Sequence, residues 1–231
     1  DEIDSLIDDD IDAGWEGDDF NVLTAGLRFQ NITIPQGATI DSAFIVVNSH
    51  EAKTAEDVAL LTIVADASDN APTFTEDALI TDRSETTASV DWTVDEEWGL
   101  WTYHQTPDIK SIVQEMIDRE GWESGNSIAF IIKGSDEQGA SEFENAREWE
   151  SFENIADPEE GGDGVNHPER VPKLVVYYTA ESYSLVIPIR KTGETQIEIE
   201  DENDVVIDTV TIDISTDDAE QENDEIDSLI D

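Results

Sequence analysis

A run of carboxylates near the start of the chain has the spacing of calcium ligands. In the stretch DDDIDAGWEGDD, acids occupy positions 1, 3, 5, 9 and 12 of a twelve-residue window: Asp8, Asp10, Asp12, Glu16 and Asp19. Closely spaced carboxylate oxygens are hard ligands, which Ca²⁺ accepts more readily than transition metals do. The turn glycine of an EF-hand loop is at position 6, whereas Gly14 is at position 7. The stretch therefore predicts a calcium site outside the EF-hand pattern, with a solvated acidic linker as the alternative.

Two further acidic stretches are weaker candidates for cation binding. STDDAEQEND contains the candidate ligands Asp217, Asp218 and Glu220. Adjacent carboxylates repel each other, so an ordered strand edge there would need a cation or a partner such as Arg147. DPEEGGDGVNHPE offers Asp157, Glu159 and Asp163, but its glycines favour a mobile loop.

Aromatic residues in WGLWTYH form a candidate glycan platform. Trp98, Trp101 and Tyr103 lie within six residues of one another, and large aromatic rings combine an apolar body with a polar tip. The alternative is that the three rings fill the core of the fold.

Enzyme chemistry has little support in the sequence. The three histidines, His50, His104 and His167, are far apart, and the chain has no Gly-rich phosphate loop and no G-x-S-x-G motif. With 58 acidic residues in the chain, a pair of neighbouring carboxylates is uninformative. We therefore predict that the protein is not an enzyme.

The charge balance limits the possible partners. Eleven Lys and Arg stand against 58 Asp and Glu, a formal net charge of −47. Nucleic acid is excluded because binding it requires a surplus of cations, and an anionic membrane surface is disfavoured for the same reason. No apolar run is long enough for membrane insertion. Such self-repulsion calls for salt or bound divalent cations, so we expect an extracellular or cell-surface location that is saline or rich in calcium.

Short alternating runs predict an all-β fold. Two such runs flank the turn PQGA from Ala25 onward, and others cover 58–65, 88–92, 128–133 and 173–178. One amphipathic helix is expected in TPDIKSIVQEMIDREGW, with Thr106 as its cap and an apolar stripe on one side. The stripe consists of Ile109, Ile112, Val113, Met116 and Ile117. The pattern favours an antiparallel, jelly-roll-like β-sandwich with one short helix.

The C-terminal part predicts a β-hairpin that cannot stand alone. TQIEIE and VVIDTVTIDI alternate strictly on either side of DEND. A hairpin with one apolar face needs a surface to pack on. We expect Val210, Ile212 and Ile214 to form the buried face of a strand used in self-association.

Several stretches together resemble a β-sandwich repeat domain of large secreted or surface-anchored bacterial proteins. They are GLRFQNITIPQGATIDSAFIVV, ASDNAPTF, TTASVDWTV, TPDIKSIVQEMIDREGWESGNSIAFIIKG, AREWESF and PKLVVYY, between Gly26 and Tyr178. The resemblance implies a non-catalytic module of adhesive or wall-associated proteins. It also implies that STDDAE, here at 215–220, belongs to the first strand of a unit. The segment 136–166 is longer and more acidic than the resemblance leads us to expect.

One octapeptide occurs twice and predicts the organisation of the chain. DEIDSLID covers residues 1–8 and 224–231, a spacing of 224 − 1 = 223 residues. We expect tandem or polymerised identical units: an acidic linker or metal loop at 1–23, the sandwich at 24–179, a hairpin connector at 180–208, and the first strand of the next unit at 209–231. The expected function is a cation-stabilised unit of an extracellular filament, fibre or adhesin stalk, joined by strand exchange or continuation. The alternatives are a self-closed monomer and a carbohydrate-binding module that binds glycans.

Overall fold

The computed structural model describes residues 10–16, 21–75, 79–135, 145–152, 164–180, 193–200 and 206–214. The chain divides into two compact units, Asp1–Glu181 and Ser182–Asp231. The first contains two antiparallel sheets and the second a two-stranded sheet. Among the described residues, no helix has the length and apolar character needed to cross a bilayer.

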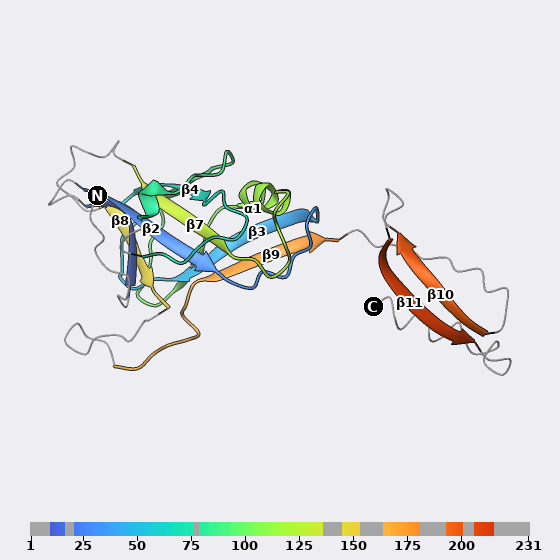
Figure 1. The fold of residues 1–231 in the computed structure, drawn as a ribbon. Coiled ribbons are helices and arrows are strands. Elements are labelled where there is room, and N and C mark those ends of the chain that lie inside the picture. The colour runs from blue at the N-terminus through green and yellow to red at the C-terminus, as the bar shows by residue number, and fades with distance from the viewer. Residues whose placement is uncertain are drawn as a thin grey trace. The chain divides into compact units, whose positions relative to one another are not determined.

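The first unit is the antiparallel β-sandwich that the sequence predicts (Figure 1). Its larger sheet has six strands in the order β5-β4-β7-β2-β1-β8, and its smaller sheet has three in the order β6-β3-β9. The strands of the larger sheet are β1 (Asp10–Glu16), β2 (Asn21–Phe29), β4 (Ala59–Ala65), β5 (Val90–Val94), β7 (Ile128–Gly134) and β8 (Asn145–Glu150). Those of the smaller sheet are β3 (Thr39–Asn48), β6 (Tyr103–Gln105) and β9 (Lys173–Thr179).

Alternate residues of both sheets supply the core. Ile45 and Val47 of β3 and Ile63 of β4 are fully buried in one apolar cluster together with Phe130 and Trp149 of the larger sheet. Successive side chains of a strand point to opposite faces, so a period of two in the sequence places one set inside. Burial of these side chains is the main source of stability of the sandwich.

The two strands around PQGA do not form the hairpin that their alternation suggests. β2 pairs with β1 and β7, whereas β3 pairs with β6 and β9. The connection passes from one sheet to the other because Ile32 bonds to the backbone of Gly125 and Asn126, and the carbonyl of Ile34 accepts the indole N–H of Trp122 at 2.9 Å. Long-range partners thus override the local turn signal.

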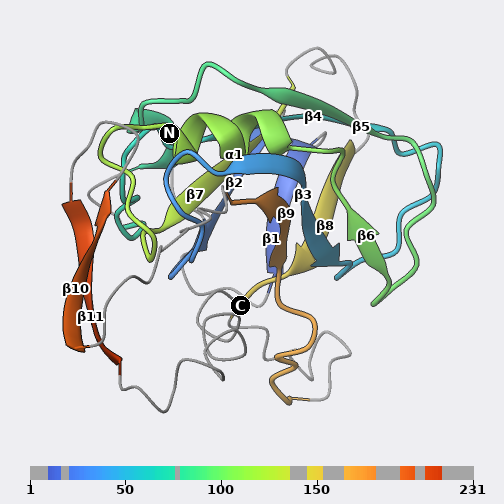
Figure 2. The ribbon, with the colours of Figure 1, turned by 90° about the vertical axis from the view of Figure 1, so that its right-hand side faces the viewer.

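The predicted helix is α1 (Lys110–Ile117), which packs against β3 (Figure 2). All five residues of its predicted apolar stripe are fully buried. Thr106 is not its cap: the Thr106 hydroxyl accepts the N–H of Ile45 at 3.1 Å. Asp108 instead accepts the N–H groups of Lys110 and Ala43, each at 3.0 Å. A 3₁₀ turn, η1 (Ile80–Asp82), is the other short helical element described.

Residues 10–16 form a strand where the sequence predicts a linker or metal loop. Ala13 and Trp15 of β1 are buried in the core and make its inner face. Gly14 has a φ of 141°, and a Cβ there would overlap the Cα of Ala146 on β8. Gly14 therefore allows β1 and β8 to approach each other closely, and it is not a loop turn.

The second unit contains the predicted C-terminal hairpin. β10 (Gly193–Glu200) pairs antiparallel with β11 (Val206–Ile214), with Thr195 opposite Ile212 and Ile197 opposite Val210. β11 runs without a break through the boundary at 208/209 that we expected between connector and next unit. The alternation is continuous across that point, so the boundary does not divide two elements.

Candidate functional site

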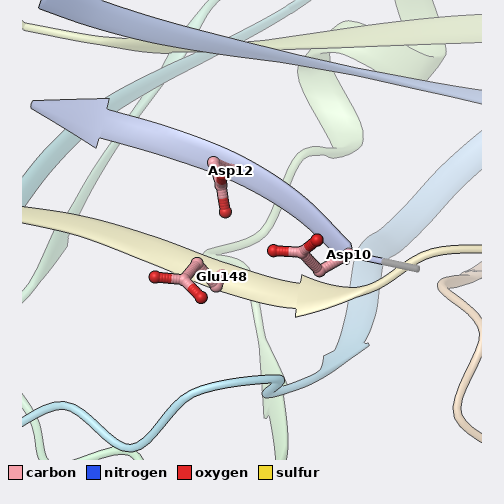
Figure 3. A group of neighbouring side chains, drawn as sticks. All are labelled: Asp10, Asp12 and Glu148. Carbon is pink, nitrogen blue, oxygen red and sulfur yellow. The ribbon is translucent and has the colours of Figure 1, made fainter. Parts of the chain in front are cut away.

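Three carboxylates from two strands converge on one side of the larger sheet. Asp12 on β1 lies directly opposite Glu148 on β8, and Asp10 lies opposite Glu150. Figure 3 shows the side chains of Asp10, Asp12 and Glu148 gathered beside the two strands. One carboxylate oxygen from each lies within 4.8 Å of the others. We call Asp10, Asp12 and Glu148 the carboxylate cluster.

The segment after β3 brings a fourth carboxylate and one ammonium group to the cluster. Ser49 forms an isolated bridge with Trp149, and the N–H of His50 donates to the carbonyl of Glu148 at 3.0 Å. This path places Glu51 and Lys53 beside β8. Lys53 forms ion pairs with Glu51 and, at 3.5 Å, with Glu148.

Burial and crowding control protonation in this region. Burial raises the pKa of Glu148 to about 9, with help from its hydrogen bond to Glu51 and from the negative charges of Asp12 and Glu51. Burial also acts to raise the pKa of Glu51, but the hydrogen bonds from Glu148 and Lys53 outweigh it and lower that pKa. At neutral pH, Glu148 therefore holds a proton that it donates toward Glu51.

Glu150 extends this acidic face along β8. The residue is fully buried, and its Oε1 lies 3.6 Å from Nδ1 of His50 and 3.5 Å from Nη1 of Arg170. Burial raises the pKa of Glu150, and the neighbouring His50 and Arg170 oppose that effect only in part. Glu150 lies two residues from Glu148 of the carboxylate cluster, and its carboxylate faces His50 and Arg170.

The structure brings together only part of the predicted calcium ligand set. Asp10 and Asp12 join the carboxylate cluster, whereas Glu16 is four residues beyond Asp12 on an extended strand, about 13 Å along it. Asp8, Asp19, Asp217, Asp218 and Glu220 lie outside the described residues, as do Asp157, Glu159 and Asp163. The three converging oxygens are suitable hard ligands for Ca²⁺, which takes six to eight oxygens in all.

Sequence reasoning missed Glu148 as a cluster member. It is 148 − 12 = 136 positions from Asp12, and only strand pairing makes them neighbours. The available signal was the position of Glu148 between Arg147 and Trp149, which are both fully buried, because successive side chains of a strand point to opposite faces. The guanidinium of Arg147, suggested above as a partner of STDDAE, donates to the carbonyls of Asp57, Ala146 and Val94, and STDDAE lies outside the described residues.

The predicted glycan platform is only partly exposed. Trp98 has 1% of its surface accessible and stacks on His104 with ring centroids 4.1 Å apart. Trp98 is a core residue: its backbone pairs with that of Lys53, and its side chain lies in the apolar cluster. Trp101 and Tyr103 are exposed to 43% and 53%, so two of the three rings remain available to a ligand.

The predicted self-association positions Val210, Ile212 and Ile214 all lie on β11. The register places them opposite Ile197, Thr195 and Gly193 of β10. In the sequence of β11, Val210, Ile212 and Ile214 alternate with Thr211 and Asp213.

Comparison of the chain with protein-family models and with curated proteins found no match. The proposals below therefore depend on the geometry and the sequence of this chain.

Proposed function

We propose that this chain is a repeat unit of an extracellular structural polymer, a filament, surface fibre or adhesin stalk, in which units join by addition of a β-strand. The observation that carries the proposal is the edge of the smaller sheet at β9. Among the described strands, β9 has β3 as its only neighbour. Unpaired N–H and C=O groups along such an edge accept a further strand.

The core beneath β9 is less completely covered than the core beneath β5, an edge strand of the larger sheet. Leu174 and Val176 of β9 face the apolar cluster but are only partly buried. On β5, Trp92 and Val94 face the same core, and only 5% and 1% of their surface is exposed. The sandwich also has three strands facing six. These differences favour an added strand beside β9.

The hairpin has the pattern that a donated element needs. In its sequence, Val210, Ile212 and Ile214 of β11 alternate with polar and acidic residues. A two-stranded hairpin is marginal alone in water, and added to β9 of another copy it would extend both the sheet and the core. The octapeptide repeated at a spacing of 223 residues supports identical units in series.

Bound Ca²⁺ belongs to the proposal as a stabilising ion. The net charge of −47 and the carboxylate cluster both favour neutralisation by cations. Asp10, Asp12 and Glu148 would supply ligands, and binding would displace the proton that Glu148 holds.

The test compares Ile212→Asp with Thr211→Asp in the full chain. Each variant adds one charge to β11, the first at an apolar position of the alternating sequence and the second at the neighbouring polar position. Sedimentation velocity and negative-stain microscopy should show assemblies for the wild type and Thr211→Asp, and monomers for Ile212→Asp. Because the Ile212→Asp chain keeps an intact β9, adding it to wild type should cap growing assemblies and shorten them.

Two results would contradict strand addition between units. If wild type and Ile212→Asp are both monomeric and equally stable, the hairpin has no docking role. If both are monomeric and only Ile212→Asp loses stability, the hairpin closes its own unit, which is the alternative noted above.

A further inference from the structure

Two exposed aromatic rings flank the segment 169–173 on the outer face of the smaller sheet. Tyr103 pairs with Asn48 in the register of β6 and β3, which places it on the face opposite to the buried Val47 and the partly buried His104. Trp101 lies two residues before the start of β6. Arg170 lies over the Trp101 ring at 4.6 Å and Lys173 over the Tyr103 ring at 5.6 Å. We call Trp101, Tyr103, Arg170 and Lys173 the aromatic platform.

The backbone holds Trp101 in a strained conformation that presents its ring. Its φ is 58°, a left-handed value that is rare for a bulky residue. Two buried residues at the end of β3 maintain it: the N–H of Trp101 donates to the carbonyl of Ser49 at 2.9 Å, and the side-chain amide of Asn48 donates to the carbonyl of Trp101 at 3.1 Å. Strain retained by buried hydrogen bonds around an exposed ring points to a functional role for that ring.

Tyr103 and Lys173 are also held in place. The Tyr103 hydroxyl donates to the carbonyl of Glu169 at 3.0 Å, and the ammonium of Lys173 donates to the same carbonyl at 2.7 Å. The rings and the cationic groups therefore form a preorganised surface, which lowers the entropy lost when a ligand binds.

The platform continues along the sheet as a half-exposed apolar strip. The register of β3 and β9 pairs Val46 with Lys173, Phe44 with Val175 and Ser42 with Tyr177. Phe44, Val46 and Val175 are partly exposed and Tyr177 is 61% exposed. An extended strip suits a chain-like ligand better than a single small molecule.

We propose that the aromatic platform binds a neutral polysaccharide, with pyranose rings stacked on Trp101 and Tyr103. The C–H face of a pyranose packs on an aromatic ring, and its hydroxyls can accept hydrogen bonds from the Arg170 and Lys173 groups that lie over the Trp101 and Tyr103 rings. A polyanionic glycan is disfavoured by the net charge of −47. This activity does not depend on strand addition, which uses the in-plane edge of β9.

The experiment measures binding of soluble neutral glycans to the full chain by calorimetry. The probes are hexamers of β-1,4-glucose, β-1,4-mannose and N-acetylglucosamine, with hexagalacturonate as the anionic comparison. At least one neutral hexamer should bind and hexagalacturonate should not. Trp101→Ala and Tyr103→Ala should each weaken binding roughly tenfold or more, as loss of an aromatic hot spot does.

Tyr178→Ala is the matched control, because Tyr178 is an exposed ring on the opposite face of β9. It should leave the affinity unchanged, and thermal melts should show that all three variants are folded. Absence of binding to every neutral hexamer overturns the proposal, as does binding that survives both platform substitutions. If the two substitutions instead abolish self-association without any glycan binding, the surface is a contact between copies and the proposal is wrong.

Discussion

Asp12 of β1 and Glu148 of β8 lie directly opposite each other in an antiparallel pair, on the outer side of the larger sheet. Like charges in this position destabilise a sheet. The pair is tolerated when a proton or a cation reduces the negative charge, and the raised pKa of Glu148 indicates the proton in the absence of metal. We therefore expect that a cation bound at the carboxylate cluster would displace this proton.

Replacing Glu148 with Gln should alter the pH dependence of stability. The pKa of Glu148 in the native state is about 9, against 4.5 for the ordinary carboxyl. The native state thus keeps a proton that the unfolded chain has released, so the free energy of unfolding of the wild type falls as pH rises from about 4.5 toward 9. Gln does not titrate, so the free energy of unfolding of Glu148→Gln should not fall in this way. The variant should be more stable than the wild type at pH 8 but not at pH 5.

Urea denaturation in EDTA at pH 5, 7 and 9 would measure this difference. Glu123→Gln, at an exposed position, is the control, and its free energy of unfolding should depend on pH as that of the wild type does. A constant offset between wild type and Glu148→Gln over the whole range would contradict the assignment of the proton to Glu148.

Calcium should stabilise the fold beyond the effect of ionic strength. At a hundredfold excess over Kd, one specific site adds about 2.7 kcal/mol. Asp12→Asn should lose this increment, whereas Glu16→Gln, at the other end of the same strand, should keep it. Thermal melts in EDTA, in millimolar Ca²⁺ and in NaCl of matched ionic strength would measure the effect. Equal melting temperatures in Ca²⁺ and NaCl would mean that only screening operates.

Arg147→Met should destabilise the sandwich by about 3 kcal/mol. The substitution removes the donors to the carbonyls of Asp57 and Val94 in the protein interior. Arg119→Met is the comparison, because Arg119 makes a partly exposed ion pair with Asp69 at 2.7 Å, and it should lose less than about 1 kcal/mol. Urea unfolding of both variants measures the two losses of unfolding free energy. Equal losses would contradict the structural role assigned to Arg147.

Trp98→Ala should cost about 4 kcal/mol of unfolding free energy, the usual range for a fully buried Trp. Trp98 packs between Trp92, His104 and the guanidinium of Arg147. Trp101→Ala should cost less than about 1 kcal/mol, since that ring is half exposed. Chemical denaturation followed by far-UV circular dichroism separates the two, and comparable losses would place Trp101 in the core as well.

The sequence by itself determined the elements with strong periodicity. Alternation predicted the sandwich strands and the β10–β11 hairpin, and the spacing of Ile109, Ile112 and Met116 predicted the buried side of α1. These signals are local, because the side-chain period of a strand or helix decides which residues share a face. The net charge is likewise a property of the sequence alone.

Only the tertiary structure decided which distant residues meet. Glu148 joins Asp12 through strand pairing, and β2 and β3 separate into different sheets although a turn lies between them. The rings of Trp98 and Trp101, three residues apart, differ in burial because Trp98 pairs with Lys53 while the backbone of Trp101 is held by Asn48 and Ser49. Local periodicity carries no information on such pairings, since they depend on which non-local contacts best cover the core.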